Sequence, residues 1–196
     1  MAFIDLIGDE EATAEATALF DRDRAALGYV PNYTRLFAHW PAVYEAWLRL
    51  KDAIAASMDT RRYELATVAA AGRLRSSYCT LAHGKVLADR FMEPAQVRDV
   101  VLDHRSAGLD EAEVAVMDLA AKVAGDATSV TEADVDRLRE AGLSDEEIFD
   151  VVAAASARCF FSKTLDALCA EADAAFAALD PELRDALTVG RPIAAG

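Results

Sequence analysis

The stretch SSYCTLAH, residues 76–83, follows an alanine-rich apolar segment and decides how the chain is expected to fold. The two serines at its start predict the end of one helix, a tight connection, and the start of a second helix near Cys79. Cys79 and His83 are four residues apart, so a helix places them on one face, about a turn from each other. The stretch therefore predicts two packed helices that present a thiol and an imidazole together.

The position of Cys79 near a helix start favours the thiolate over the thiol. If Ser76 or Ser77 is the N-cap, Cys79 is the third or second helical residue, where free backbone N–H groups and the helix dipole attract an anion. His83 is placed to accept the thiol proton. Glu64 on the preceding helix could orient the imidazole if the two helices pack antiparallel. Arg75 adds a positive charge that could attract an anionic substrate or support the thiolate.

These residues also have a structural interpretation. Cys79 could be a buried small residue beside a histidine that hydrogen-bonds a carbonyl, and Glu64 could be a helix-surface charge. A zinc site would have only two ligands in Cys79 and His83, because no CxxC or second histidine pair completes a tetrahedral set. No metal or other cofactor is therefore predicted. His39, before a Trp-Pro helix break, is interpreted as a packed histidine that could line a pocket, as could Tyr78.

Composition narrows the class of protein. The chain has 196 residues, a net charge of −14, and mostly alanine, leucine and acidic residues, which together predict one all-α domain over residues 1–196. The acidic balance argues against nucleic-acid binding. No apolar segment reaches the ~18–20 residues of a membrane span, and the N-terminus lacks a secretory signal. The three cysteines (Cys79, Cys159 and Cys169) are an odd number, which fits free thiols in a reducing cytoplasm.

Helical periodicity and capping signals divide the chain into elements. We expect helices over roughly 10–27, 32–38, 41–57, 59–74, 76–90, 93–102, 110–124 and 145–170, with another that starts at 131–134. The core is expected over 28–170, and the tail from about 180 is expected to be peripheral. Similar VAAA segments at 68–71 and 152–155 suggest a duplicated helix pair. An aromatic cluster is predicted as core or subunit interface, and its members are Tyr29, Tyr33, Phe37, Tyr44 and Trp47.

The spacing of the candidate residues resembles a family motif. Glu64 is followed after eleven residues by Ser76, then after two by Cys79, and after three more by His83. The alkylhydroperoxidase AhpD-like proteins of the carboxymuconolactone decarboxylase superfamily have a glutamate, eleven residues, and then C-x-x-C-x-x-x-H. Further similarities to the peroxidase-related branch lie at 30–32, 39–41, 131–132 and 142–147, so the resemblance covers about residues 28–170.

The resemblance implies a fold, an activity and an assembly. The fold would be an all-α AhpD-like helical bundle, and the activity would be reduction of peroxides by an antioxidant oxidoreductase. Cys79 would be the nucleophile, His83 the base and Glu64 the far end of a proton relay. Cys79 would become a sulfenic acid, which an unidentified thiol reductant would return to the thiol. Family members form homo-oligomers, so a dimer, trimer or hexamer is implied.

Ser76 departs from the family motif because it occupies the position of the first, resolving cysteine. A serine cannot form the disulfide that closes the family's catalytic cycle. Cys79 could instead be resolved by an external thiol or by Cys159 or Cys169. Two alternatives stay open: a decarboxylase-type acid/base enzyme that uses His83 and Glu64, and a non-catalytic oligomer or redox sensor on the same fold.

Overall fold

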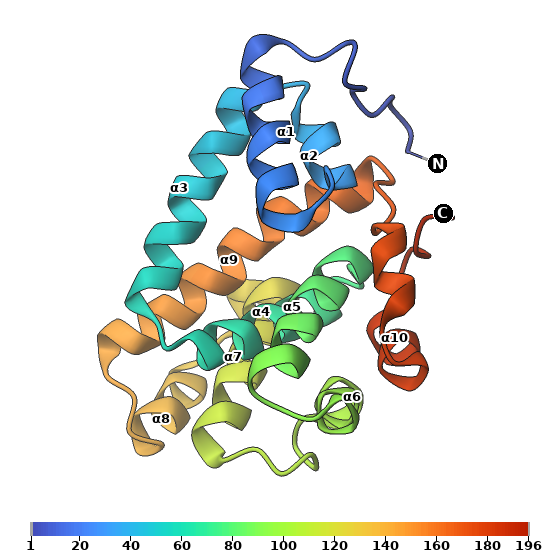
Figure 1. The fold of residues 1–196 in the computed structure, drawn as a ribbon. Coiled ribbons are helices and arrows are strands. Elements are labelled where there is room, and N and C mark those ends of the chain that lie inside the picture. Colours follow the sequence, from blue (N-terminus) through green and yellow to red (C-terminus); the bar gives the residue numbers. More distant parts are fainter. Residues whose placement is uncertain (1, 196) are drawn as a thin grey trace.

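The computed structural model describes residues 2–195, and within them the regular structure is helical, as the sequence predicts (Figure 1). No strand is present in that part of the chain, where a single β-bridge joins Ala172 and Ile193. The elements are α1 Ala14–Leu27, α2 Asn32–Phe37, α3 Pro41–Ser57, α4 Thr60–Arg73, α5 Ser77–Arg90, α6 Pro94–Asp103, α7 Glu111–Asp126, η1 Ala127–Ser129, α8 Glu132–Glu140, α9 Asp145–Ala167, η2 Ala174–Ala178 and α10 Pro181–Leu187.

Most helix starts follow the sequence signals. Pro41 is the first residue of α3, where its missing N–H costs nothing. The Asp59 side chain accepts a hydrogen bond from the Arg62 N–H and caps α4. Thr131 and Ser144 form capping boxes at the starts of α8 and α9. Local chemistry thus accounts for these boundaries.

One helix start differs from the prediction, and another helix starts as predicted with a partner that lies far along the chain. The first helix begins at Ala14, after the Thr13 cap, and not at residue 10. Asn32 is the first residue of α2, as expected, and its side chain donates a hydrogen bond to the Glu171 carbonyl at 3.1 Å. Its partner is 139 residues away in the chain, so sequence-local reasoning could not identify this role.

Helix α4 lies at the centre of the molecule and packs against α5, α7 and α9. Its buried face consists largely of small side chains, including Ala66, Ala70 and Ala71, which let neighbouring helices approach closely. This packing fixes α4 on several sides. Glu64, which belongs to the same helix, is therefore held inside the protein.

The core has two apolar clusters on either side of this central helix. One joins α1, α2, α3 and α5 to the C-terminal segment, and it contains Cys79. The other lies between α4, α7, α8 and α9, and Cys159 packs against it. Figure 1 shows α3 running alongside α9, with α1 and α2 above them and α5 to α7 below. None of the described helices combines the length and apolar character needed to cross a bilayer.

The segment after residue 180 is not peripheral, contrary to the sequence-based expectation. It forms α10, which packs on α5 and α6 and buries Leu183 and Leu187. Gly84 of α5 makes room for this contact, because a Cβ at that position would lie 2.4 Å from a Leu187 methyl group. The element is short and carries few apolar residues, so its burial depends on a complementary surface elsewhere in the chain.

The suggested second copy of the α4–α5 pair has no matching helix break. The chain leaves the helical conformation between Arg73 and Ser77, whereas α9 continues without interruption from Asp145 to Ala167. The VAAA similarity at 152–155 thus reflects a shared small-residue helix face rather than a second helix pair.

Candidate active site

The turn between α4 and α5 places Cys79 in the first turn of a buried helix. Arg75 adopts the left-handed conformation with φ 58°, which reverses the chain so that α5 packs against α4. Ser76 is the N-cap residue and α5 starts at Ser77, so Cys79 is the third helical residue. Its thiol therefore lies where the unpaired N–H groups and the dipole of α5 favour a negative charge.

Glu64 and His83 form a close pair across the two helices. Nδ1 of His83 lies 2.5 Å from Oε2 of Glu64. Because an ionised carboxylate can only accept hydrogen bonds, Nδ1 is the donor and Nε2 is left as an acceptor when the ring is neutral. Burial, reinforced by the nearby charge of Arg158, lowers the pKa of His83. The imidazole is thus a neutral base whose tautomer is set by Glu64.

Arg158 brings a buried positive charge to the thiol. Its Nη1 lies 3.5 Å from Sγ of Cys79, and the two residues are only 4% and 2% exposed. The guanidinium lies 5.5 Å from the ring centroids of both Trp47 and Phe161, so aromatic faces support its charge. Burial disfavours that charge, but Cys79 and Tyr63 outweigh burial and raise the pKa of Arg158. The arginine therefore remains charged beside Cys79.

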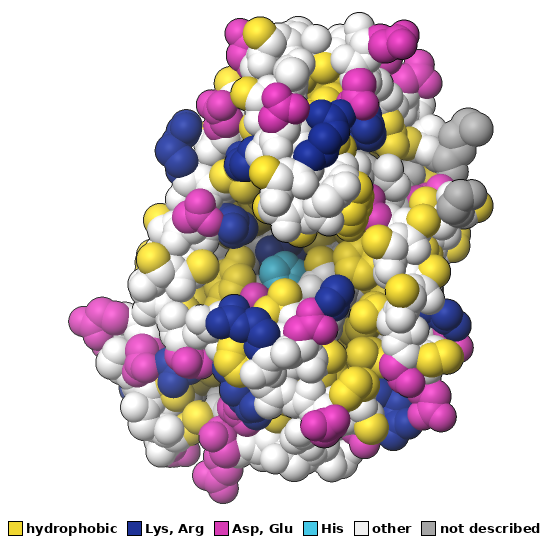
Figure 2. Space-filling view, in the orientation of Figure 1, with side chains coloured by type: hydrophobic (Ala, Val, Ile, Leu, Met, Phe, Trp, Pro, Cys, Tyr) yellow, Lys and Arg dark blue, Asp and Glu magenta, His cyan; other side chains and the backbone are white. Residues whose placement is uncertain are grey.

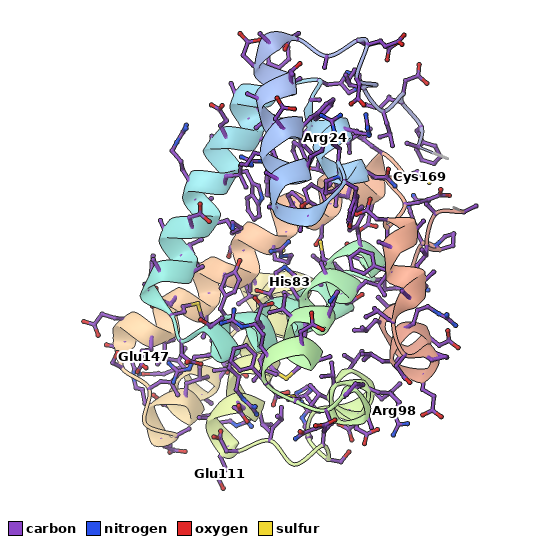
Figure 3. All side chains as sticks on the ribbon, in the orientation of Figure 1. Arg24, His83, Arg98, Glu111, Glu147 and Cys169 are labelled. Carbon is purple, nitrogen blue, oxygen red and sulfur yellow. The ribbon has the colours of Figure 1, made fainter. Side chains whose placement is uncertain are left out.

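A cavity of about 170 Å³ opens onto these groups. Its walls bring together residues of α2, α3, α5 and α9: Tyr33, Tyr44, Trp47, Leu48, Lys51, Tyr78, Cys79, Ala82, His83, Arg158 and Phe161. Figure 2 shows a hollow in the middle of one face with a histidine at its floor, and Figure 3 places His83 at the same point. The cavity gives a substrate a route to a sulfur that is otherwise covered.

The predicted aromatic cluster forms both core and cavity wall. Phe37 stacks on Tyr44 with centroids 5.2 Å apart, while Tyr33, Tyr44 and Trp47 line the cavity. The expectation of core or interface therefore missed the role of these rings in a pocket. Tyr29 does not join them, and its hydroxyl instead lies 3.4 Å from Asp173.

Tyr78 contributes its ring to the cavity, while its hydroxyl is anchored elsewhere. The hydroxyl donates to Oδ2 of Asp173 at 2.5 Å, and the Asn32 N–H donates to the other carboxylate oxygen at 2.8 Å. Burial, followed by the charge of Asp173, raises the pKa of Tyr78 well above its ordinary value. Tyr78 is thus a fixed, neutral wall of the pocket next to Cys79.

The remaining candidates lie outside the cavity lining. Arg75 is exposed, and its Nε donates to the Val189 carbonyl at 3.3 Å. Nε2 of His39 lies 2.8 Å from the Asp5 carbonyl oxygen on the surface. Ser76 is fully buried, and its hydroxyl makes no hydrogen bond of ordinary geometry. The structure brings Cys79, His83 and Tyr78 to one cavity and pairs Glu64 with His83, whereas these three residues do not line that cavity.

The other two cysteines lie away from the cavity lining. Sγ of Cys159 is 4.0 Å from the Ala124 carbonyl oxygen, and Sγ of Cys169 is 3.0 Å from Nη1 of Arg191. All three thiols of the chain are free. Figure 3 shows Cys169 beside the C-terminal segment, well separated from His83. Within residues 2–195, no three His, Cys, Asp or Glu side chains converge as a metal site would require.

Sequence reasoning missed Arg158, Lys51 and Asp173. Arg158 had a signal, because it interrupts the apolar face of α9 between buried Ala154 and Leu165. A charged residue on an otherwise buried helix face indicates a partner inside the protein. Lys51 and Asp173 carry no such signal, since surface acidic and basic residues are common throughout this chain.

Solved structures of similar fold include AhpD-like proteins. A peroxidase-related protein from Ralstonia eutropha JMP134, described as an alkylhydroperoxidase AhpD core, has a TM-score of 0.81 at 22% identity over 89% of this chain and 94% of its own. A peroxidase-related protein from Silicibacter sp. TM1040 also has a TM-score of 0.81 at 22% identity, over 90% and 94%. No protein-family model and no curated protein matches the sequence.

A third similar structure has a different named activity. The debrominase Bmp8, as a cysteine-to-alanine variant in complex with 2,3,4-tribromopyrrole, has a TM-score of 0.74 at 16% identity. The match covers 95% of this chain and 98% of that one. Proteins of this fold therefore have different named activities, so the reaction has to be inferred from the side chains of the site.

Proposed function

Because the chain has the AhpD-like fold, we propose that it is a peroxidase that reduces peroxides through Cys79 alone. The observation that carries the proposal is the 3.5 Å approach of the buried Arg158 guanidinium to Sγ of Cys79. The sulfur and the His83 ring line the same cavity. A cation and a base next to one thiol are what a reactive thiolate requires.

The first step is formation of the thiolate. Neutral His83 accepts the Cys79 proton at Nε2, and Glu64 stabilises the resulting imidazolium through Nδ1–H. The Arg158 guanidinium and the start of α5 stabilise the negative sulfur. The proton is thereby stored on His83 within the site.

The second step is attack on the peroxide. The thiolate sulfur displaces the alkoxide from the terminal oxygen of the hydroperoxide, so the O–O bond breaks and an S–O bond forms. The alkoxide takes the proton from His83 and leaves as an alcohol. Sulfur is oxidised by two electrons to a sulfenic acid at Cys79, and the peroxide is reduced by the same two electrons.

Trapping of the sulfenic acid tests this function. One equivalent of tert-butyl hydroperoxide is added to the reduced protein with a dimedone-type reagent, and the labelled residue is found by mass spectrometry. We expect the label on Cys79, loss of labelling in Cys79→Ser, and retention in the matched control Cys159→Ser. Peroxide consumption by Cys79→Ser at the wild-type rate would refute the proposal.

The same variants separate the alternatives. An acid/base enzyme of the decarboxylase type would tolerate Cys79→Ser but lose activity in His83→Ala. A redox sensor would consume one equivalent of peroxide and stop even with excess thiol present. Under our proposal, Cys79→Ser and His83→Ala both slow peroxide reduction, and excess thiol sustains turnover.

A second candidate function follows from the aromatic walls of the cavity. Tyr33, Tyr44 and Trp47 line the same cavity as Cys79, and aromatic walls suit a flat aromatic substrate. Reductive debromination would convert a bromoarene and two thiols into the arene, a disulfide and hydrogen bromide. Release of bromide from 2,3,4-tribromopyrrole in the presence of thiol, absent in Cys79→Ser, would favour this activity over peroxide reduction.

A further inference from the structure

We propose that Cys79 is regenerated by a small anionic thiol that enters the cavity and binds between Arg158 and Lys51. The inference rests on the proposed peroxidase function and adds to it the class of the reductant. Three properties of the site support it: no second thiol lines the cavity, the cavity is small, and its walls carry positive charge.

No second thiol of the chain lies in the cavity. The position three residues before Cys79 holds Ser76, which cannot form a disulfide. Cys159 contacts the Ala124 carbonyl and Cys169 contacts Arg191, and neither residue lines the cavity. The electrons that reduce the oxidised sulfur must therefore come from a thiol outside the protein.

The covering of Cys79 restricts the size of that thiol. The residue is 2% exposed, and disulfide formation requires the two sulfurs to approach to about 2.05 Å. A cysteine on a folded protein surface does not reach a sulfur at the bottom of a cavity. The cavity of about 170 Å³ is close in size to an engineered cavity of about 150 Å³ that holds benzene. An incoming thiol of about six non-hydrogen atoms fits that space.

The charges on the cavity walls favour a negative thiol. Arg158 and Lys51 line the cavity, and no Asp or Glu side chain does. Glu64 is paired with His83 behind the wall. Asp52 lies 2.7 Å from Nζ of Lys51, but its side chain is 68% exposed and screened by solvent. Figure 2 shows Lys and Arg side chains around the hollow. An anion entering the cavity therefore meets net positive charge.

The regeneration consumes two thiols per turnover. The first thiol gives its proton to His83 and attacks the sulfenic sulfur as a thiolate, so an S–S bond forms and the S–O bond breaks. The departing hydroxide takes that proton back from His83 and leaves as water. A second thiol attacks the mixed disulfide, which releases a symmetrical disulfide and restores the Cys79 thiol. The two electrons that reduced the peroxide are thus supplied by oxidation of two small thiols.

Turnover with thiols of different charge tests the inference. Peroxide consumption is measured with 3-mercaptopropionate, 3-mercaptopropanol and cysteamine, each at the same thiolate concentration, and with a thioredoxin-type protein dithiol. We expect the anionic thiol to be about fivefold faster than the neutral one, as suits a partly exposed ion pair, and cysteamine to be slowest. In Lys51→Met the ratio of anionic to neutral rates falls towards one. In the matched control Lys85→Met, an exposed lysine outside the cavity, the ratio is unchanged.

Different results would overturn different parts of the scheme. Equal rates for all three small thiols in the wild type would refute the anion preference. Faster turnover with the protein dithiol, or a Cys79 disulfide to Cys159 or Cys169, would refute the small external reductant. Absence of any Cys79 sulfenic acid in the thiol-free trapping experiment would refute the peroxidase function itself, and with it this inference.

Discussion

At the scale of single residues, Arg158 is the least expected member of the site. A guanidinium that is nearly fully buried needs a counter-charge, because desolvation of an unpaired ion is strongly unfavourable. Its hydrogen bond goes to Sγ of Cys79, while its Nε has no hydrogen-bond partner. Under the proposed function, the arginine would stabilise a Cys79 thiolate, and that thiolate would supply the counter-charge of the arginine.

Removal of this charge should slow oxidation of Cys79. A hydrogen bond to a charged group contributes about 1.5–3 kcal/mol, so we expect Arg158→Met to lower the rate of sulfenic acid formation by about tenfold to a hundredfold. Arg158→Lys should recover part of the rate, since it restores the charge. Arg49→Met, at an exposed position on α3, is the control. Stopped-flow mixing with hydroperoxide measures the rate, and an unchanged rate in Arg158→Met would contradict the assigned role.

Only part of the site was predictable, because some of its residues are far apart in the sequence. Cys79 and His83 are four residues apart on one helix, and the spacing of Glu64 belongs to a motif that covers both packed helices. Arg158 reaches the thiol from 79 residues away, and Lys51 lines the same cavity. Helix periodicity predicts which residues share a face of one helix, but not which faces of different helices meet. The presence of Arg158 and Lys51 in the site could therefore be found only from the structure.

At the scale of elements, α10 and the residues that follow it support α5, the helix that carries Cys79 and His83. Leu187 packs against Gly84 of α5, and its carbonyl lies 2.5 Å from the Thr80 hydroxyl. Farther along, the Gly190 N–H donates to Oγ of Ser77 at 2.8 Å. A segment that was expected to be peripheral therefore holds the first turns of α5 through the buried Leu187 side chain and two hydrogen bonds.

Truncation of Leu187 should destabilise the fold. The side chain is 0% exposed, and a buried Leu→Ala change costs about 2–5 kcal/mol through lost contacts and the cavity left behind. The control Leu102→Ala, at an exposed position on α6, should stay within about 0.5 kcal/mol of the wild type. Urea unfolding measures both, and equal free energies of unfolding for the two variants would show that α10 is dispensable.

At the scale of the whole molecule, acidification should weaken the folded state through His83. Burial, with the charge of Arg158, lowers the pKa of this histidine in the folded protein. As pH falls through the unfolded value of about 6.5, the unfolded chain binds the proton before the folded chain does. The unfolded state is then favoured, so the free energy of unfolding decreases as pH falls.

Comparison of His83→Gln with the wild type isolates this effect. We expect the wild type to lose more free energy of unfolding than His83→Gln between pH 7.5 and 5.5. The net charge of −14 also changes with pH, but it does so almost equally in both proteins. His39→Gln, at an exposed position, is the control and should follow the wild type. Urea titrations at the two pH values give the comparison, and parallel losses in all three proteins would exclude a role for His83.

Residues 187–190 contact α5 but are synthesised after it, so these contacts form late. Glu64, Cys79, His83 and Arg158 all leave the ribosome before Leu187 and Gly190 do, and nascent chains fold from their N-terminal parts first. The first turns of α5 therefore gain the Thr80 and Ser77 contacts only after these four residues have been synthesised. The helix that carries the thiol can thus pack against α4 and α9 before the C-terminal contacts hold its first turns.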